Sequence, residues 1–81
     1  MALYFFHLRD GVDVALDPDG IELPSLDAAR KKALEAARDS LSHDIKAGRM
    51  DVGLRIDVEN GDGRVLHSQP FREAFEISGA D

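Results

Sequence analysis

The sequence predicts an α+β domain in which two β-hairpins flank one amphipathic helix, in the order ββαββ. Three observations predict this class: a β-favouring aromatic run at residues 3–8, apolar residues at three- and four-residue steps over 26–45, and an alternating run at 54–69 broken by a glycine turn. A chain of 81 residues has material for one hydrophobic core. We therefore expect a single domain over residues 1–77 and a disordered tail over residues 78–81.

The first hairpin is predicted from the aromatic run and the turn after it. Residues 3–8 read Leu-Tyr-Phe-Phe-His-Leu and end at Asp10-Gly11, a strong turn signal. Residues 12–16 return as a short second strand with apolar side chains at alternate positions. Asp17-Pro18-Asp19-Gly20 then makes a tight turn, because proline presets φ and glycine accepts a positive φ.

A long helix follows Pro24, and Ser25 stands at the position of its N-cap. Asp27 places a carboxylate in the first turn, where the helix dipole favours it, and Gly48 is the expected C-cap. One apolar stripe should face the core: Leu26, Ala29, Ala33, Leu34, Ala37, Leu41 and Ile45. Replacing Ser25 by alanine should cost about 1 kcal/mol of stability without affecting function.

The second hairpin carries an ambiguity of register. Residues 54–59 alternate apolar and charged side chains, as a strand with one buried face does. A two-residue loop at Gly61-Asp62 would place Val65, His67 and Gln69 on the core face. A three-residue loop closing on Gly63 in a G1 bulge would place Leu66 and Ser68 there instead. Asn60 and Asp62-Gly63 suit the ends of a type I turn, so we prefer the three-residue loop.

The predicted sheet is a four-stranded antiparallel one with strand order 2-1-3-4 and the helix on one face. On the first strand Tyr4, Phe6 and Leu8 form the more apolar set and should lie under the helix. The uncovered face then carries the candidate interface residues: Leu3, Phe5, His7, Val65 and His67.

The sequence leaves two interpretations of this uncovered face open. Residues 70–77 either fold over it, with Phe71 or Phe75 as the anchor, or leave it open. An open apolar patch on a small protein marks self-association or a protein partner, so a homodimer is one expected state.

No catalytic, cofactor-binding or metal-binding residue is predicted. His7, His43 and His67 lack the HxH, HxxxH or HExxH spacing that brings metal ligands together. The turns around Gly20 and Gly63 resemble calcium loops, but neither has the first acid or the final glutamate of such a loop. The chain has no GxSxG elbow and no glycine-rich phosphate loop before a helix, so we expect no cofactor.

Net charge and composition limit the classes of partner and the cellular locations that we expect. The net charge of −6 repels phosphate backbones, so a nucleic-acid partner is not expected. The chain has no cysteine, which excludes disulfides and fits a reducing compartment. No stretch is apolar and long enough for a signal peptide or a membrane span, so we expect a cytoplasmic protein without a membrane partner.

Four segments together resemble a known family: Tyr4-Phe5-Phe6-His7-Leu8-Arg9-Asp10-Gly11, Asp17-x-x-Gly20-x-Glu22-Leu23-Pro24, the helix start Leu26-Asp27-Ala28-Ala29-Arg30, and Gly63-Arg64-Val65-Leu66 running to Pro70-Phe71. They are similar to short alphaproteobacterial proteins, frequent in rhizobia and their relatives, classed as a domain of unknown function. The resemblance covers nearly the whole chain and implies a stand-alone bacterial domain. It implies no catalytic or binding residue.

A weaker similarity links the early strand, turn and Ala-rich helix to antitoxin domains with a partial RNase-H-like fold. Such domains bind a toxin partner, but the chain after Pro70 has no room for their DNA-binding tail. The leading hypothesis is therefore a non-enzymatic interaction or self-associating module that uses the open sheet face. The alternatives are an antitoxin-like partner-binding domain, and a small-ligand or enzyme domain whose site forms between subunits around His7 or His67.

Overall fold

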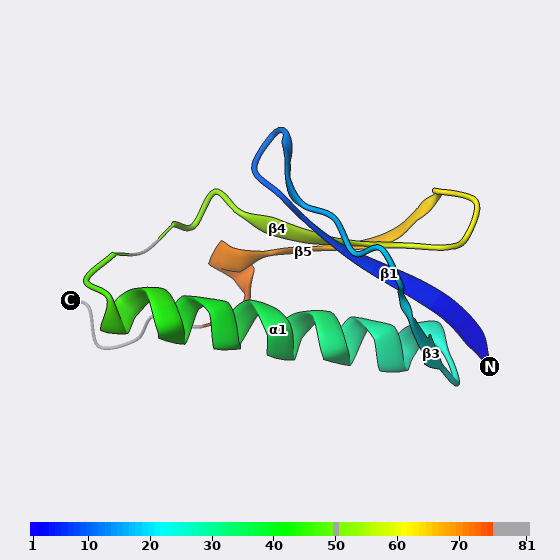
Figure 1. Cartoon of the computed structure of the whole chain (residues 1–81). Helices are drawn as coiled ribbons and strands as arrows, with labels where there is room; N and C mark the ends of the chain where they lie inside the picture. Colours follow the sequence, from blue (N-terminus) through cyan, green and yellow to red (C-terminus); the bar gives the residue numbers. More distant parts are fainter. Residues whose placement is uncertain (50, 76–81) are drawn as a thin grey trace.

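One helix lies across one face of an antiparallel sheet, and no helix of residues 1–49 and 51–75 covers the other face (Figure 1). The computed structural model describes residues 1–49 and 51–75. Its elements are β1 (Ala2–Arg9), β2 (Asp13–Ala15), β3 (Ile21–Leu23), α1 (Leu26–Lys46), β4 (Arg55–Glu59), β5 (Val65–Pro70) and the short 3₁₀ helix η1 (Phe71–Glu73). The predicted α+β class is confirmed, and the order β2-β1-β4-β5 is the predicted strand order.

The sheet has a fifth strand, which the sequence did not predict. β3 pairs antiparallel with the first half of β1, on the same edge where β2 pairs with the second half. Pro18 has no N–H to donate, so the edge strand is interrupted between Ala15 and Ile21. We call residues 16–20 the Asp17 loop. β2 and β3 thus act as one edge strand with a loop inserted opposite the middle of β1.

The helix forms where its caps and apolar stripe predict it. The Ser25 hydroxyl accepts a hydrogen bond from the Ala28 N–H at 3.2 Å, so the predicted N-cap is confirmed. At the other end the C-cap is Ala47 rather than the predicted Gly48. Gly48 follows it with φ +85°, and its N–H donates to the Ile45 carbonyl at 3.0 Å. The stripe is buried at Ala29, Ala33, Ala37 and Leu41. Ile45 is an exception: 55% of it is exposed, because the stripe runs past the end of the sheet.

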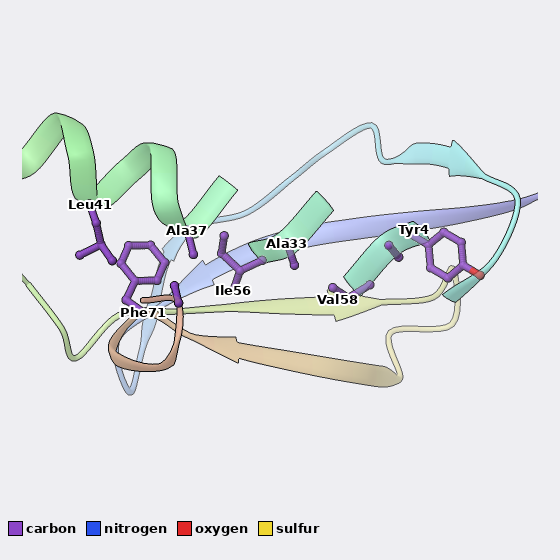
Figure 2. Packing of buried hydrophobic residues seen from close by; sticks show 9 residues of the cluster. Tyr4, Ala33, Ala37, Leu41, Ile56, Val58 and Phe71 are labelled. Carbon is purple, nitrogen blue, oxygen red and sulfur yellow. The ribbon is translucent and has the colours of Figure 1, made fainter. Parts of the chain in front are cut away.

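The core lies between α1 and the helix-facing side of the sheet (Figure 2). Ala33 and Ala37 bring the helix backbone close to Ile56 and Val58 on β4. Tyr4 is buried on β1, and Phe6 and Leu8 pack against the same cluster, as the alternation of β1 predicts. Small helix residues facing large strand residues explain how so short a chain encloses a core.

The β4–β5 hairpin has the predicted three-residue loop, together with a second irregularity that shifts the register of β5. Gly63 has φ +82°, and its N–H donates to the Asn60 carbonyl at 3.1 Å. Glu59 then pairs with Val65, whereas Val58 pairs with His67, so Leu66 is an extra residue in β5. Leu66 packs against the core as predicted. The prediction that Ser68 faces the core is wrong, because the bulge shifts it opposite Asp57.

Residues 71–75, the described part of the chain after β5, pack on the helix side of the sheet and close the core. The Phe71 N–H donates to the Leu54 carbonyl at 2.9 Å, and the Phe71 side chain is fully buried. Phe75 also packs against the core. The interpretation in which Phe71 or Phe75 covers the far face is therefore wrong. The predicted tail at residues 78–81, and the domain boundary at residue 77, lie outside the described residues.

Candidate functional site

The face of the sheet opposite α1, here called the open face, is the candidate site. Side chains at every second position of β1 and β4 point to it, and the register of β5 adds two more. Its members are Leu3, Phe5, His7, Arg9, Arg55, Asp57, Glu59, Val65 and Ser68. The middle of this face is charged, and its apolar members lie toward one end.

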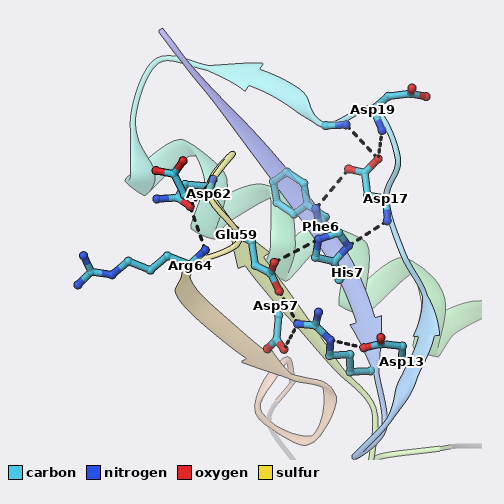
Figure 3. A network of polar contacts seen from close by, with 12 residues as sticks. Phe6, His7, Asp13, Asp17, Asp19, Asp57, Glu59, Asp62 and Arg64 are labelled. Atoms are coloured by element: carbon cyan, nitrogen blue, oxygen red, sulfur yellow. Dashed lines mark hydrogen bonds and ion pairs between the residues drawn. The ribbon is translucent and has the colours of Figure 1, made fainter.

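Arg9 is the centre of a group of ion pairs on this face. Its Nη1 donates to Asp57 Oδ2 at 2.8 Å and to Glu59 Oε2 at 2.5 Å, both on β4 (Figure 3). Its Nε donates to Asp13 Oδ1 at 2.7 Å on β2. The hydrogen bond to Asp57, followed by those to Asp13 and Glu59, raises the pKa of Arg9 above its ordinary value. One guanidinium therefore joins three strands.

Asp57 is the most buried acid of the group, with 4% of its side chain exposed. Its carboxylate accepts from the Ser68 hydroxyl at 2.6 Å and from Arg55 Nε at 3.1 Å, in addition to Arg9. Burial raises the pKa of this carboxyl, but the hydrogen bonds from Ser68, Arg9 and Arg55 hold it below its ordinary value. We call Arg9, Arg55, Asp57, Glu59 and the Ser68 hydroxyl the ion cluster.

His7 connects the ion cluster to the Asp17 loop. Its Nδ1 accepts the backbone N–H of Asp17 at 3.0 Å, so this nitrogen carries no proton. The proton of the neutral ring is then on Nε2, which lies 3.5 Å from Glu59 Oε1. Both ring nitrogens are thereby assigned to partners within the chain (Figure 3).

The Asp17 carboxylate replaces the missing strand contacts of the loop. Oδ2 accepts the Phe6 N–H at 3.2 Å, and Oδ1 accepts the N–H groups of Asp19 and Gly20. Partial burial raises the pKa of Asp17, but the hydrogen bonds from Gly20, Phe6 and Asp19 lower it below its ordinary value. The Asp17 carboxylate and the His7 ring therefore fix the loop against β1.

This arrangement has the residue types of an acid–base site but not the geometry of one. A general base needs a ring nitrogen or carboxylate free to take a proton from a substrate. His7 Nδ1 already accepts the Asp17 N–H, Nε2 lies 3.5 Å from Glu59, and Asp57 and Glu59 both accept from Arg9. The polar groups therefore hold one another in place across β1, β2 and β4.

The apolar members of the open face are accessible. Leu3 is 40% exposed and Val65 is 47% exposed, while the Phe5 ring is half-buried. Phe5 lies almost parallel to the His7 ring, with the ring centroids 6.2 Å apart. Phe5 is also opposite Glu59, which in turn is opposite Val65. In the row Phe5–Glu59–Val65, an apolar side chain therefore lies on each side of Glu59, which is the edge of the ion cluster.

The structure brings together four of the five candidate interface residues. Leu3, Phe5 and His7 share one side of β1, and Val65 joins them through its pairing with Glu59. The prediction for His67 is wrong: it is opposite Val58, whose side chain is in the core, because the bulge at Leu66 reverses the alternation.

The ion cluster was missed by the reasoning from sequence. Asp57 and Glu59 are only 3% and 7% exposed, although alternation along β4 predicts that both are solvated. The signal that could have found them is the pairing of strands with opposite charges. Arg9 follows the aromatic run of β1, and the predicted neighbour strand carries Asp57 and Glu59 on the same face.

A comparison with known protein families identifies the family of the chain. Residues 3–72 match the family described as Domain of unknown function (DUF6894). The chain belongs to the DUF6894 family. The match begins at the second residue of β1 and ends within η1, so it spans nearly all of the sheet–helix unit. No curated protein and no solved structure matches the chain.

Two further findings concern the part of the DUF6894 domain that the structure describes. In residues 1–49 and 51–75 no group of three or more His, Cys, Asp or Glu side chains is arranged to hold a metal ion. Over the same residues, no helix has the length and apolar character needed to cross a membrane.

Proposed function

We propose that this DUF6894 domain is a protein-interaction module that binds a protein partner with its open face. The observation that carries the proposal is the exposure of Leu3 and Val65 beside a preordered ion cluster on the uncovered side of the sheet. Protein interfaces combine buried apolar anchors with polar groups around them.

The order of the ion cluster supports binding. A side chain that is free in solution loses rotamer entropy when a partner immobilises it. Arg9 is already held by three carboxylates and Asp57 by three donors, so this cost is met in the free protein. The open face can thus present charges of both signs at fixed positions around Phe5.

The same contacts argue against the alternative in which the domain is an enzyme or a small-ligand module. That alternative requires His7 or His67 in a deep site with free acids. His7 Nδ1 accepts the Asp17 N–H and Nε2 lies 3.5 Å from Glu59, and His67 is opposite Val58 on the other side of the sheet. The exposed apolar side chains of Leu3 and Val65 are what the interaction hypothesis requires.

We also propose that the protein is cytoplasmic and of bacterial origin. A chain without cysteine is suited to a reducing compartment, which supports a cytoplasmic location. The likeness of residues 4–11 to short alphaproteobacterial proteins supports a bacterial origin.

A comparison of two valine substitutions tests the proposal. Val65→Glu adds a charge to the open face, and Val52→Glu makes the same change at an exposed valine in the loop before β4. We expect a lysate of the native organism to yield partners that bind the wild type and Val52→Glu but not Val65→Glu. Leu3→Glu should lose the same partners. If both valine variants capture what the wild type captures, the open face is not the binding surface.

A further inference from the structure

The charge of the chain is concentrated in one segment. Residues 10–29 contain six Asp or Glu side chains and no Lys, Arg or His. The remaining residues contain ten acidic and ten basic side chains, so the whole net charge of −6 arises in residues 10–29. This segment forms the β1–β2 turn, β2, the Asp17 loop, β3 and the start of α1.

The first part of the acidic segment also exposes aliphatic side chains. Val12 is 70% exposed, and Val14 and Leu16 are each 53% exposed. They alternate with Asp13 and Ala15 along the edge strand, and Asp10 precedes them at the turn. We call Asp10, Val12, Asp13, Val14 and Leu16 the acidic ridge. It stands at the edge of the sheet, in the hairpin that rises away from α1 (Figure 1).

A groove of complementary character lies elsewhere on the same chain. It has a volume of about 420 Å³ and runs along the C-terminal half of α1 beside Phe75. Leu41, Ile45 and Phe75 give it apolar walls, and among the described residues its lining includes Arg38 and Lys46 but no acid. Its volume is within the range of sites that bind ligands or side chains. Ile45, which the sheet leaves uncovered, is the most accessible apolar part of the wall.

We propose that the acidic ridge of one copy docks into this groove of a second copy. Val14 and its neighbours would enter the apolar groove, and Asp10 would approach the cations at its rim. Charge complementarity identifies a second copy as the occupant of the groove. The ridge combines aliphatic side chains with acids, and the groove combines apolar walls with cations. Such a contact either closes into a symmetric dimer or repeats from copy to copy. It uses neither Leu3 nor Val65, and it touches the open face only through Asp13, which is paired with Arg9.

Complementation between two variants tests this contact. Val14→Lys alters only the ridge, and Ile45→Glu alters only the groove. Sedimentation velocity should show the 8.9 kDa chain associating as concentration rises. Each variant alone should associate at least about tenfold more weakly, the change that 1.4 kcal/mol produces. An equimolar mixture should recover association, because the intact ridge of Ile45→Glu can enter the intact groove of Val14→Lys.

Three checks test whether a loss of association is specific to the ridge and the groove. Val52→Lys changes an exposed valine in the loop before β4, outside the ridge, the groove and the open face, and should associate as the wild type does. Raising the salt concentration from about 0.1 M to 1 M shortens the screening length from about 10 Å to 3 Å and should weaken association. Circular dichroism spectra matching the wild type would show that each variant is folded.

Four results would overturn the proposal. The wild type would stay monomeric at every concentration, or both variants would associate normally, or their mixture would fail to recover. The fourth is association that arises only after deletion of residues 76–81, since that segment, rather than a second copy, would then occupy the groove of the full chain.

Discussion

Replacing Asp57 by asparagine tests the ion cluster, because it removes the charge and keeps the shape of the side chain. The carboxylate accepts from Ser68, Arg9 and Arg55 at 2.6–3.1 Å and is almost fully buried. Breaking a buried ion pair costs about 3–5 kcal/mol when the partner charge is stranded. Arg9 keeps Glu59 and Asp13, and the amide can still accept from Ser68, so we expect a smaller loss of about 2 kcal/mol.

Urea denaturation measures this loss directly. A chain of 81 residues has a stability of about 4–12 kcal/mol, so a change of about 2 kcal/mol is easily resolved. The pKa of Asp57 is lowered in the folded state, so its stabilising effect is complete above the unfolded value of about 3.9 and is lost as pH falls through the folded value. The difference between wild type and Asp57→Asn should therefore be largest near pH 7 and shrink below about pH 4.

A matched control and a clear negative result complete this experiment. Asp62 is an exposed acid in the β4–β5 turn, so Asp62→Asn should change stability by less than about 0.5 kcal/mol. Equal stability of Asp57→Asn and wild type at pH 7 would refute the stabilising role of the ion cluster. A loss that did not depend on pH would show that the charge of Asp57 is not its source.

Three further predictions concern the core and the Asp17 loop. Phe71→Ala should lower the free energy of unfolding by about 3–5 kcal/mol in urea, since the ring is fully buried; a loss under about 1 kcal/mol would contradict the docking of η1. Gly20→Ala should lower the melting temperature more than Gly11→Ala. Both glycines have positive φ, but of the two only Gly20 has neighbouring atoms as close as 3.0 Å to an added Cβ. Equal effects of the two substitutions would count against the close packing of the loop. His7→Asn keeps an acceptor near the Nδ1 position, whereas His7→Leu removes it. Hydrogen exchange at the Asp17 amide should accelerate only in His7→Leu, and acceleration in both or in neither would disprove the hydrogen bond.

Local signals in the sequence were enough to predict much of this fold. Ser25 and Gly48 mark the ends of the helix to within one residue, because caps depend on neighbouring backbone groups. Gly63 closes the predicted loop for the same reason, since a positive φ is a property of one residue. These features need no information about distant parts of the chain.

The features that escaped prediction depend on contacts between distant residues. The bulge at Leu66 is two residues beyond Arg64, where the loop ends, and nothing in the hairpin sequence marks it. It moved His67 off the open face, because one extra residue reverses every later side chain. Asp57 is buried because Arg9, 48 residues away in sequence, lies on the adjoining strand. The candidate face was thus predictable, but its charged centre was not.

Methyl NMR of the domain with a captured partner tests the central claim most directly. The claim is that the open face, with Leu3 and Val65 as its accessible anchors, contacts the partner. We predict that the methyl signals of Leu3 and Val65 shift on titration, while those of Leu41 and Ile45 in the groove keep their positions. Shifts confined to Leu41 and Ile45, with Leu3 and Val65 unchanged, would contradict the claim.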